Sequence, residues 1–367
     1  MNPVNDLLFA PFSFKALKLP NRIVMAPMTR SHSPDGVPTD EVVGYYRRRA
    51  EAEVGLIITE GTTVDYASAS NDPKIPSFCK EASLAGWRKV VEAVHAAGGK
   101  IAPQLWHQGV ARKAGTGPQP DAPVLSPSGL AGPGKPVAQP MSIAQIEQVV
   151  RQFATAAGHA RRLGFDAIEL HGAHGYLIDQ FFWEGTNQRD DAYGGSLLKR
   201  TRFAVEIIEA CRTAVGPDLP IILRFSQWKQ QDYEAKLAHT PEELEQFLTP
   251  LARAGVDIFH ASTRRFWQPE FEGSELNLAG WTKKLTGKPT ITVGSVGLDD
   301  DFIASFMGKG AGTAGIDQLL ERMQHGEFDL VAVGRALLLD PNWARKLHRG
   351  EVDQFQPFNP AALATLS

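Results

Sequence analysis

Short apolar segments rich in β-branched residues recur along the chain, and each is followed by a segment with helical periodicity. Eight of them are present, at residues 22–28, 56–62, 100–106, 167–172, 220–226, 258–263, 290–295 and 330–335. Buried parallel strands have this nearly continuous apolar character, and the helices between them make the crossover connections. The pattern therefore predicts an α/β fold with eight alternating strands and helices, a (β/α)8 TIM barrel.

Two of the intervening helices carry clear start signals. The segment 142–163 begins at Ser142 and ends before Gly164, and the segment 240–254 begins at Thr240 and Pro241 with Glu243 three residues on. Ser and Thr cap helix N-termini, Pro suits the first turn, and Gly suits the residue after the last turn. These signals support the alternation of strands and helices.

Two segments depart from a minimal barrel. Residues 9–19 precede the first strand and are expected to form a short hairpin that plugs the amino end of the barrel. Residues 110–140 follow the third strand and are dense in Gly and Pro, so we expect a long capping loop or lid. With residues 342–367 as a C-terminal tail, the chain is predicted to form one domain, residues 1–367.

Composition narrows the functional class. The chain has 367 residues, 43% of them hydrophobic, and a net charge of −3 without a long basic run, which argues against a nucleic-acid partner. Because no apolar run approaches about 20 residues and no signal peptide is recognisable, we expect a cytoplasmic protein without membrane contact. Cys79 and Cys211 form no CxxC pair, which argues against a disulfide framework, a thiolate zinc site or an iron–sulfur cluster.

Polar residues interrupt strands in which packing alone would favour Val or Leu. They are Glu60, Gln104, Glu169, His171 and Arg224. A buried Arg224 would pair either with Glu60 or Glu169 or with a bound electron-rich ligand, and by itself the residue leaves both possibilities open. Gln104 adds a donor and an acceptor, which suit the pyrimidine edge of a flavin.

The last two strands end in Gly294 and in Gly334–Arg335. The loops after strands seven and eight of such barrels commonly bind phosphate, so these residues together with a flavin ring indicate flavin mononucleotide, FMN. Residues 310–315 match GxGxxG, but the motif follows a helix-like segment instead of a strand. We therefore interpret it as a loop and not as a dinucleotide site.

A strand that leads into a polar loop carries His171, His174 and Tyr176 within six residues. The HxxH spacing would suit zinc, but no third ligand pattern accompanies it, so we expect no metal site. A structural role for one histidine is the other alternative. The arrangement favours two hydrogen-bond donors for a substrate oxygen and a phenol that donates a proton.

Seven stretches match one known family in order and spacing, at residues 21–30, 55–62, 104–109, 168–182, 187–196, 223–226 and 333–341. Over residues 8–339 the chain resembles the Old Yellow Enzyme family of FMN-dependent ene reductases. The resemblance implies that NAD(P)H reduces the flavin, and that the flavin then reduces the activated C=C bond of an α,β-unsaturated carbonyl or nitro compound.

The resemblance also implies individual roles. The flavin ring would contact Pro27, Met28, Thr29, Gly61, Gln104, His171 and Arg224, and the phosphate would contact Gly294, Gly334 and Arg335. The Thr29 hydroxyl would tune the flavin potential. His171 and His174 would hold the substrate oxygen, Tyr176 would donate the proton, and Trp106 would shape the pocket.

The sequence departs from the family pattern after the sixth strand, at residues 262–271, where Arg264, Arg265, Phe266 and Trp267 are expected near the substrate mouth. In the tail, Phe355 and Phe358 are expected to pack on the barrel. A flavin barrel of the dienoyl-CoA reductase or amine dehydrogenase kind, and a flavin-binding sensor without turnover, are the alternatives. The chain is expected to act as a monomer or a homo-oligomer.

Overall fold

The computed structural model describes residues 3–65, 67–301 and 308–367. Eight strands close into a barrel in the order β10-β3-β4-β5-β6-β7-β8-β9, and all neighbouring pairs are parallel. The strands are β3 (Ile23–Met25), β4 (Leu56–Thr63), β5 (Lys100–Trp106), β6 (Ile168–His174), β7 (Ile221–Lys229), β8 (Ile258–Ser262), β9 (Thr290–Val293) and β10 (Leu330–Val333). Each corresponds to one predicted segment, so the (β/α)8 TIM barrel is confirmed.

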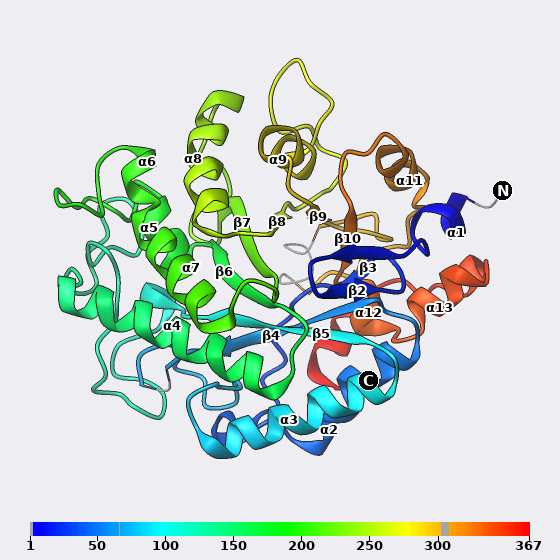
Figure 1. Ribbon diagram of the computed structural model, residues 1–367, viewed down its shortest axis with the longest axis horizontal. Helices are drawn as coiled ribbons and strands as arrows, with labels where there is room; N and C mark the ends of the chain where they lie inside the picture. The colour runs from blue at the N-terminus through cyan, green and yellow to red at the C-terminus, as the bar shows by residue number, and fades with distance from the viewer. Residues whose placement is uncertain (1–2, 66, 302–307) are drawn as a thin grey trace.

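Helices surround the barrel, as Figure 1 shows. The main ones are α2 (Asp40–Glu51), α3 (Glu81–Ala96), α4 (Ile143–Leu163), α7 (Arg202–Val215), α8 (Pro241–Ala254), α9 (Leu278–Thr286) and α11 (Asp317–Gln324). Shorter helices are α1 (Pro3–Leu7), α5 (Leu177–Phe182), α6 (Leu197–Arg200), α12 (Arg335–Leu339) and α13 (Trp343–His348), with 3-10 turns at Pro34–Gly36, Gly109–Ala111, Val352–Gln354 and Pro360–Ala364.

Both predicted start signals act as caps. Ser142 accepts the N–H of Gln145, whose side chain reaches back to the backbone of Ser142, and Gly164 ends α4 with a φ of 87°. Thr240 accepts the N–H of Glu243 at the start of α8. These local bonds set where the helices begin and so fix the lengths of the loops that follow the strands.

The predicted plug is the antiparallel hairpin of β1 (Phe12–Phe14) and β2 (Leu17–Leu19), drawn in dark blue in Figure 1. Phe12, Leu17 and Leu19 pack in one cluster with side chains of the barrel interior such as Leu56 and Ile222. At its turn, Lys15 forms an ion pair of 2.7 Å with Asp257, which directly precedes β8. The hairpin therefore closes the amino end and leaves the carboxyl end for the site.

The loop of residues 110–140 follows β5 as predicted, but none of its residues lines the cavity described below. It packs on neighbouring connections instead: Arg189 donates to the carbonyls of Pro127 and Met141, and Gln188 donates to the hydroxyl of Ser128. The predicted role of residues 110–140 as a lid is therefore not supported by contacts with the cavity.

Two smaller predictions concern the last part of the chain. Residues 310–315 form a loop in which Ala311 pairs with Phe358, while the helix-like segment expected before them lies largely outside the described residues. Phe355 stacks on Trp343 with ring centroids 5.5 Å apart, and Phe358 is buried. Both tail aromatics therefore pack on their own barrel.

Candidate active site

A cavity of about 300 Å³ opens at the carboxyl end of the barrel. Its walls come from the ends of the strands and the residues directly after them, where chemistry is placed in this architecture. The sequence-predicted residues that line it are Pro27, Met28, Thr29, Gly61, Gln104, Trp106, His171, His174, Tyr176, Arg224, Gly294, Gly334 and Arg335. Residues from all eight strands or their ends thus meet at one place.

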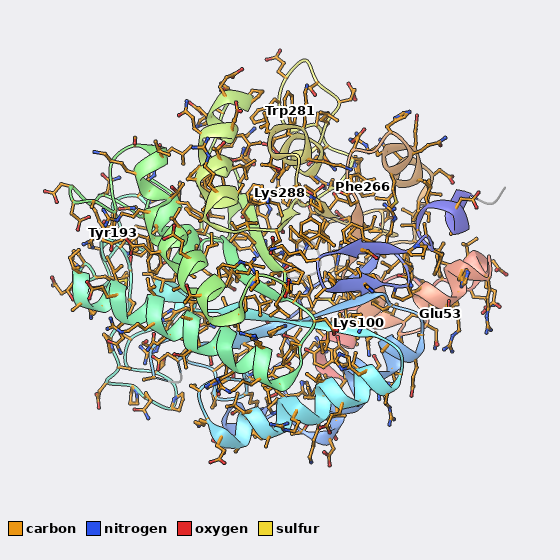
Figure 2. All side chains as sticks on the ribbon, viewed as in Figure 1. Glu53, Lys100, Tyr193, Phe266, Trp281 and Lys288 are labelled. Atoms are coloured by element: carbon orange, nitrogen blue, oxygen red, sulfur yellow. The ribbon has the colours of Figure 1, made fainter. Side chains whose placement is uncertain are left out.

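Phe266 and Trp267 are not among the lining residues, which corrects their predicted place in the substrate pocket. Phe266 is only 4% exposed and belongs to the hydrophobic core, and Trp267 packs against it with ring centroids 5.2 Å apart. Figure 2 shows Phe266 among packed side chains between α9 and α11 in this view. Thr263 and Arg264, a few residues earlier, line the cavity instead.

A bulge brings the two histidines together. His171 and His174 are three positions apart, so strict strand alternation would send them to opposite faces. The pairing of β6 with β7 shifts between Gly172 and His174, and His174 has a positive φ of 64°. Because a bulge re-aims the side chain that follows it, both rings line the cavity, with centroids 5.2 Å apart.

Both imidazoles are neutral because of their surroundings. Burial lowers the pKa of His171 and of His174 well below the ordinary value of 6.5, and the Arg224 guanidinium lowers each further. The Nδ1 of His171 accepts the N–H of Ala173 at 3.4 Å, which leaves its proton on Nε2. Nε2 of His174 lies 2.8 Å from the Oγ of Ser262. Two neutral imidazoles can hold an oxygen on which negative charge develops.

Tyr176 follows β6 by two residues and stands at the start of α5. Its ring packs edge to face against Trp106 and His171, with centroids 4.9 Å away in each case. Burial raises the pKa of Tyr176 above the ordinary value of 10.0, while the hydrogen bond from Gln230 and the charge of Arg224 lower it in part. The phenol is therefore protonated at neutral pH and can serve as an acid.

Arg224 resolves the alternative left open by the sequence. It is 7% exposed, its Nη2 donates to Ser262 Oγ at 3.2 Å, and its buried Nε has no hydrogen-bond partner among the described residues. Neither candidate carboxylate bonds to it in the described part of the chain, since Glu60 instead accepts the N–H groups of Arg30 and Ser31. A buried guanidinium with an unpaired donor fits an anionic or electron-rich ligand in the cavity.

Glu169, the second candidate partner, fixes Gln104. Its Oε1 accepts the amide Nε2 of Gln104 at 2.8 Å, and its Oε2 lies 2.6 Å from Nδ1 of His260. The carbonyl oxygen of Gln104 is thereby left as an acceptor in the cavity that Arg224 also lines. An acceptor and a cation in one cavity match the pyrimidine edge of a flavin.

Two glycines shape the other end. A Cβ at Gly294, whose φ is +150°, would lie 2.7 Å from Thr263 Oγ1 and 2.9 Å from the nitrogen of Phe266, so the fold itself requires glycine there. A Cβ at Gly334 would meet only Met28 Sδ at 3.6 Å and Ala26 Cβ at 3.8 Å, which are ordinary contacts. Packing does not require Gly334, and its missing side chain leaves room beside the cavity for a phosphate.

Arg335 stands next to this space. It donates to the carbonyl oxygens of Asp301 at 2.9 Å and of Asp300, and to Ser295 Oγ at 3.2 Å. Burial lowers the pKa of Arg335 although three aspartates, residues 299–301, raise it. The guanidinium is thus held in place by the loop after β9, and a phosphate would add a further partner.

Sequence reasoning missed several lining residues. Trp228 lies in β7, which runs three residues past its predicted end, and Gln230 directly follows that strand. Ser262 is the last residue of β8. Phe358 and Leu363 come from the tail, which Arg30 holds by donating to the carbonyls of Ala362, Leu363 and Thr365. The largely polar residues 226–231 after the predicted strand could have indicated that Gln230 lies near the site. No pattern in the sequence predicted that the tail lines the cavity.

A closed parallel barrel whose mouth combines an amide acceptor, an arginine with an unused donor, a glycine that packing does not require and two neutral histidines is typical of a flavin-binding oxidoreductase of the (β/α)8 class. The chain matches the NADH:flavin oxidoreductase / NADH oxidase family over residues 7–354, and it belongs to that family. The match confirms the resemblance to the Old Yellow Enzyme family and supports FMN as cofactor and NAD(P)H as reductant.

Individual proteins similar to this chain agree with the family assignment. The chain is 36% identical to an NADH oxidase from Thermoanaerobacter brockii over 362 residues, covering 95% of this chain but 52% of that protein, so it spans about half of that relative's length. It is 34% identical to an NADPH dehydrogenase from Halalkalibacterium halodurans, covering 92% of this chain and 93% of that one. The structure of morphinone reductase in complex with tetrahydroNAD matches with a TM-score of 0.81 at 28% identity, over 97% and 94% of the two chains.

Two further observations concern the described residues only. They contain no group of three or more His, Cys, Asp or Glu side chains placed to hold a metal ion. None of their helices is long and apolar enough to cross a membrane.

Proposed function

We propose that the protein is an NAD(P)H-dependent ene reductase that reduces the activated C=C bond of α,β-unsaturated carbonyl or nitro compounds. The observation that carries the proposal is that His171, His174 and Tyr176 line the same cavity as Gln104 and Arg224. FMN, when bound, supplies the transfer of hydride from NAD(P)H to the substrate. The tetrahydroNAD complex of morphinone reductase supports a nicotinamide as the reductant.

Two of the residues that would hold FMN, Arg224 and Gln104, have a donor or an acceptor that no protein group uses in the described part of the chain. Arg224 would meet the pyrimidine edge with its unpaired Nε, and Gln104 would accept a hydrogen bond there through its free carbonyl oxygen. Gly334 and Arg335 would hold the phosphate, and Thr29, which lines the same cavity, would offer its hydroxyl.

The two histidines would bind and polarise the substrate. Both are neutral and line the cavity beside Tyr176, so each can donate one hydrogen bond to a carbonyl or nitro oxygen. When a C=C bond conjugated to that oxygen accepts hydride at the β-carbon, negative charge develops on the oxygen. Donors placed in a water-poor cavity stabilise that charge more strongly than water does.

Tyr176 would complete the reaction by protonating the α-carbon. The phenol keeps its proton at neutral pH because its burial raises the pKa, and its ring is fixed between Trp106 and His171. A positioned acid of this kind typically accelerates a reaction by about 10²- to 10⁴-fold.

An anaerobic experiment with the FMN-loaded protein and a product assay tests the proposal. NADPH is expected to bleach the flavin absorption, and 2-cyclohexenone is expected to restore it with formation of one equivalent of cyclohexanone. Bleaching without recovery, tried also with a nitroalkene and a maleimide, would keep the flavin chemistry and overturn the alkene substrate.

A further inference from the structure

The last residue of β7 and the two residues after it bind the segment that carries His174 and Tyr176. Lys229 Nζ lies 2.8 Å from Asp179 Oδ1, and both side chains are fully buried. The backbone N–H of Gln230 donates to the carbonyl of His174 at 3.3 Å, and the side chain of Gln231 donates to the carbonyl of Gly175 at 3.3 Å. Three successive residues, 229–231, thus hold the segment 174–179.

Gln230 also contacts the phenol itself. Its Nε2 donates to the Oη of Tyr176 at 3.0 Å, and both residues line the cavity, with Gln230 at the exposed rim. Because the phenol oxygen is the acceptor in this bond, its own hydrogen is not used in it. In the described part of the chain no other hydrogen bond reaches this oxygen. The rings of Trp106 and His171 pack edge to face against the phenol ring.

We propose that Gln230 is a positioning residue for proton transfer, one that holds the oxygen of Tyr176 as an acceptor so that the O–H bond points into the cavity. The inference rests on the proposed role of Tyr176 as proton donor. During the transfer the Oη–H bond breaks and its electron pair stays on the oxygen, while the carbanion pair of the substrate forms the new C–H bond. Gln230 remains hydrogen-bonded to the phenolate until water returns the proton.

The charges around the phenol agree with this role. Arg224 faces it from β7, His171 and His174 face it from β6 as neutral rings, and Trp106 on β5 carries no charge. Burial is the largest influence on the pKa of Tyr176 and raises it, and the bond from Gln230 is the first influence that lowers it. An amide donor can therefore stabilise the phenolate without adding a charge that would deprotonate the phenol beforehand.

Single-turnover kinetics with the FMN-loaded protein test the proposal. Gln230→Leu is expected to slow flavin reoxidation by 2-cyclohexenone about tenfold, the effect of one hydrogen bond, and to change flavin reduction by NADPH less than about twofold. Gln230→Glu should slow reoxidation at least as much, since a carboxylate cannot donate and would draw the phenol hydrogen away from the cavity. Gln230→His, which keeps an N–H donor, should recover part of the rate.

A double-mutant cycle separates this role from a structural one. In a Tyr176→Phe background, Gln230→Leu should cause no further slowing, because the oxygen it serves is gone. Gln231→Leu is the matched control, since it removes a bond to the same segment without touching the phenol, and its effect should persist in that background. Equal slowing by Gln230→Leu in both backgrounds would overturn the proposal.

A second readout does not depend on turnover. In protein labelled with ¹³Cζ-tyrosine, the signal of Tyr176, assigned by its loss in Tyr176→Phe, should titrate at a higher pH in Gln230→Leu than in wild type. An unchanged titration would overturn the contact between Gln230 and Tyr176. If wild type reduced no alkene while this shift was present, the proposed function would fail and the contact would stand.

Discussion

Glu169 Oε1 lies 2.8 Å from the amide nitrogen of Gln104 at a position fully closed to solvent. On its other side the same carboxylate lies 2.6 Å from Nδ1 of His260. Glu169 therefore forms no hydrogen bond or ion pair with Arg224 in the described part of the chain, although its charge raises the pKa of that guanidinium. It orients the Gln104 amide, and the Nε of Arg224 is left for a ligand.

Replacing Glu169 tests this orientation. In Glu169→Leu the Gln104 amide loses its anchor, and we expect the Kd for FMN to rise about tenfold, or about 1.4 kcal/mol. Glu169→Gln keeps an acceptor oxygen for Gln104 and should stay within about threefold of wild type. FMN fluorescence during titration of the apoprotein measures both constants, and an unchanged Kd in Glu169→Leu would contradict the account.

Arg224→Met should separate cofactor binding from stability. Loss of a charge-assisted hydrogen bond is expected to weaken FMN binding by about 2 kcal/mol, roughly 30-fold. The apoprotein should be as stable as wild type or more stable, because a buried guanidinium without a carboxylate partner is removed. Thermal unfolding of both apoproteins provides the comparison.

The matched control for that experiment is Arg212→Met. Arg212 forms an ion pair with Asp257 and donates to the carbonyl of Leu219 at 2.8 Å, away from the cavity. It should lose stability and retain FMN affinity, the opposite of Arg224→Met. A stability loss in Arg224→Met as large as that in Arg212→Met would show that Arg224 is structural.

Acid sensitivity is expected from buried neutral histidines. Burial lowers the pKa of His107 from 6.5 to about 4. Between pH 6.5 and pH 4, His107 is therefore protonated in the unfolded chain but neutral in the folded protein. Stability from this group is therefore complete above pH 6.5 and declines as the pH falls toward 4. Glu60, whose pKa burial raises to about 7, opposes this trend over part of the range.

A difference measurement isolates the histidine. Denaturant unfolding of wild type and of His107→Gln at several pH values between 7.5 and 4 should show wild type losing stability relative to the variant. The change is expected to be on the order of 3 kcal/mol over the window, and to lie almost entirely below pH 6.5. A difference that stays constant with pH would contradict a neutral, buried His107.

The buried pair of Lys229 and Asp179 is expected to be costly to break. Asp179→Asn leaves the ammonium without its counter-charge and should lower the free energy of unfolding by about 3–5 kcal/mol. The double variant Asp179→Leu with Lys229→Met should recover most of this loss, since no buried charge remains. Denaturant titrations measure both, and a single variant as stable as wild type would contradict the pairing.

The fold was predictable because its strands are buried on both sides. Such strands are continuous apolar runs, and all eight were found within a few residues of their observed bounds. The ends of β3 and β7 were each missed by three residues, at β7 because residues 227–229 are polar or bulky although they are buried in the structure. Gln227 donates to the carbonyl of Ala238, Trp228 to the carbonyl of Ser262 and Lys229 to Asp179, and a local pattern does not show these contacts.

Site residues that lie on strands could be predicted from the sequence, whereas those that lie in loops were harder to predict. His171, Gln104 and Arg224 lie on strands, so the strand order alone gathers them. Phe266 and Trp267 follow β8 in a connection whose path depends on tertiary contacts, and a glycine at 294 lets that connection approach closely enough to bury Phe266. Leu363 reaches the cavity from a tail that Arg30, Arg48 and Arg49 bind.

The most direct test of the central claim compares wild type with Tyr176→Phe in the two halves of the reaction. After anaerobic mixing, flavin reduction by NADPH should proceed at rates within about twofold of each other in the two proteins. Reoxidation of the reduced proteins by 2-cyclohexenone should be at least about 100-fold slower in Tyr176→Phe, because the acid that protonates the α-carbon is missing. Equal rates of reoxidation, or equal losses in both halves, would contradict the assignment of Tyr176 as the proton donor.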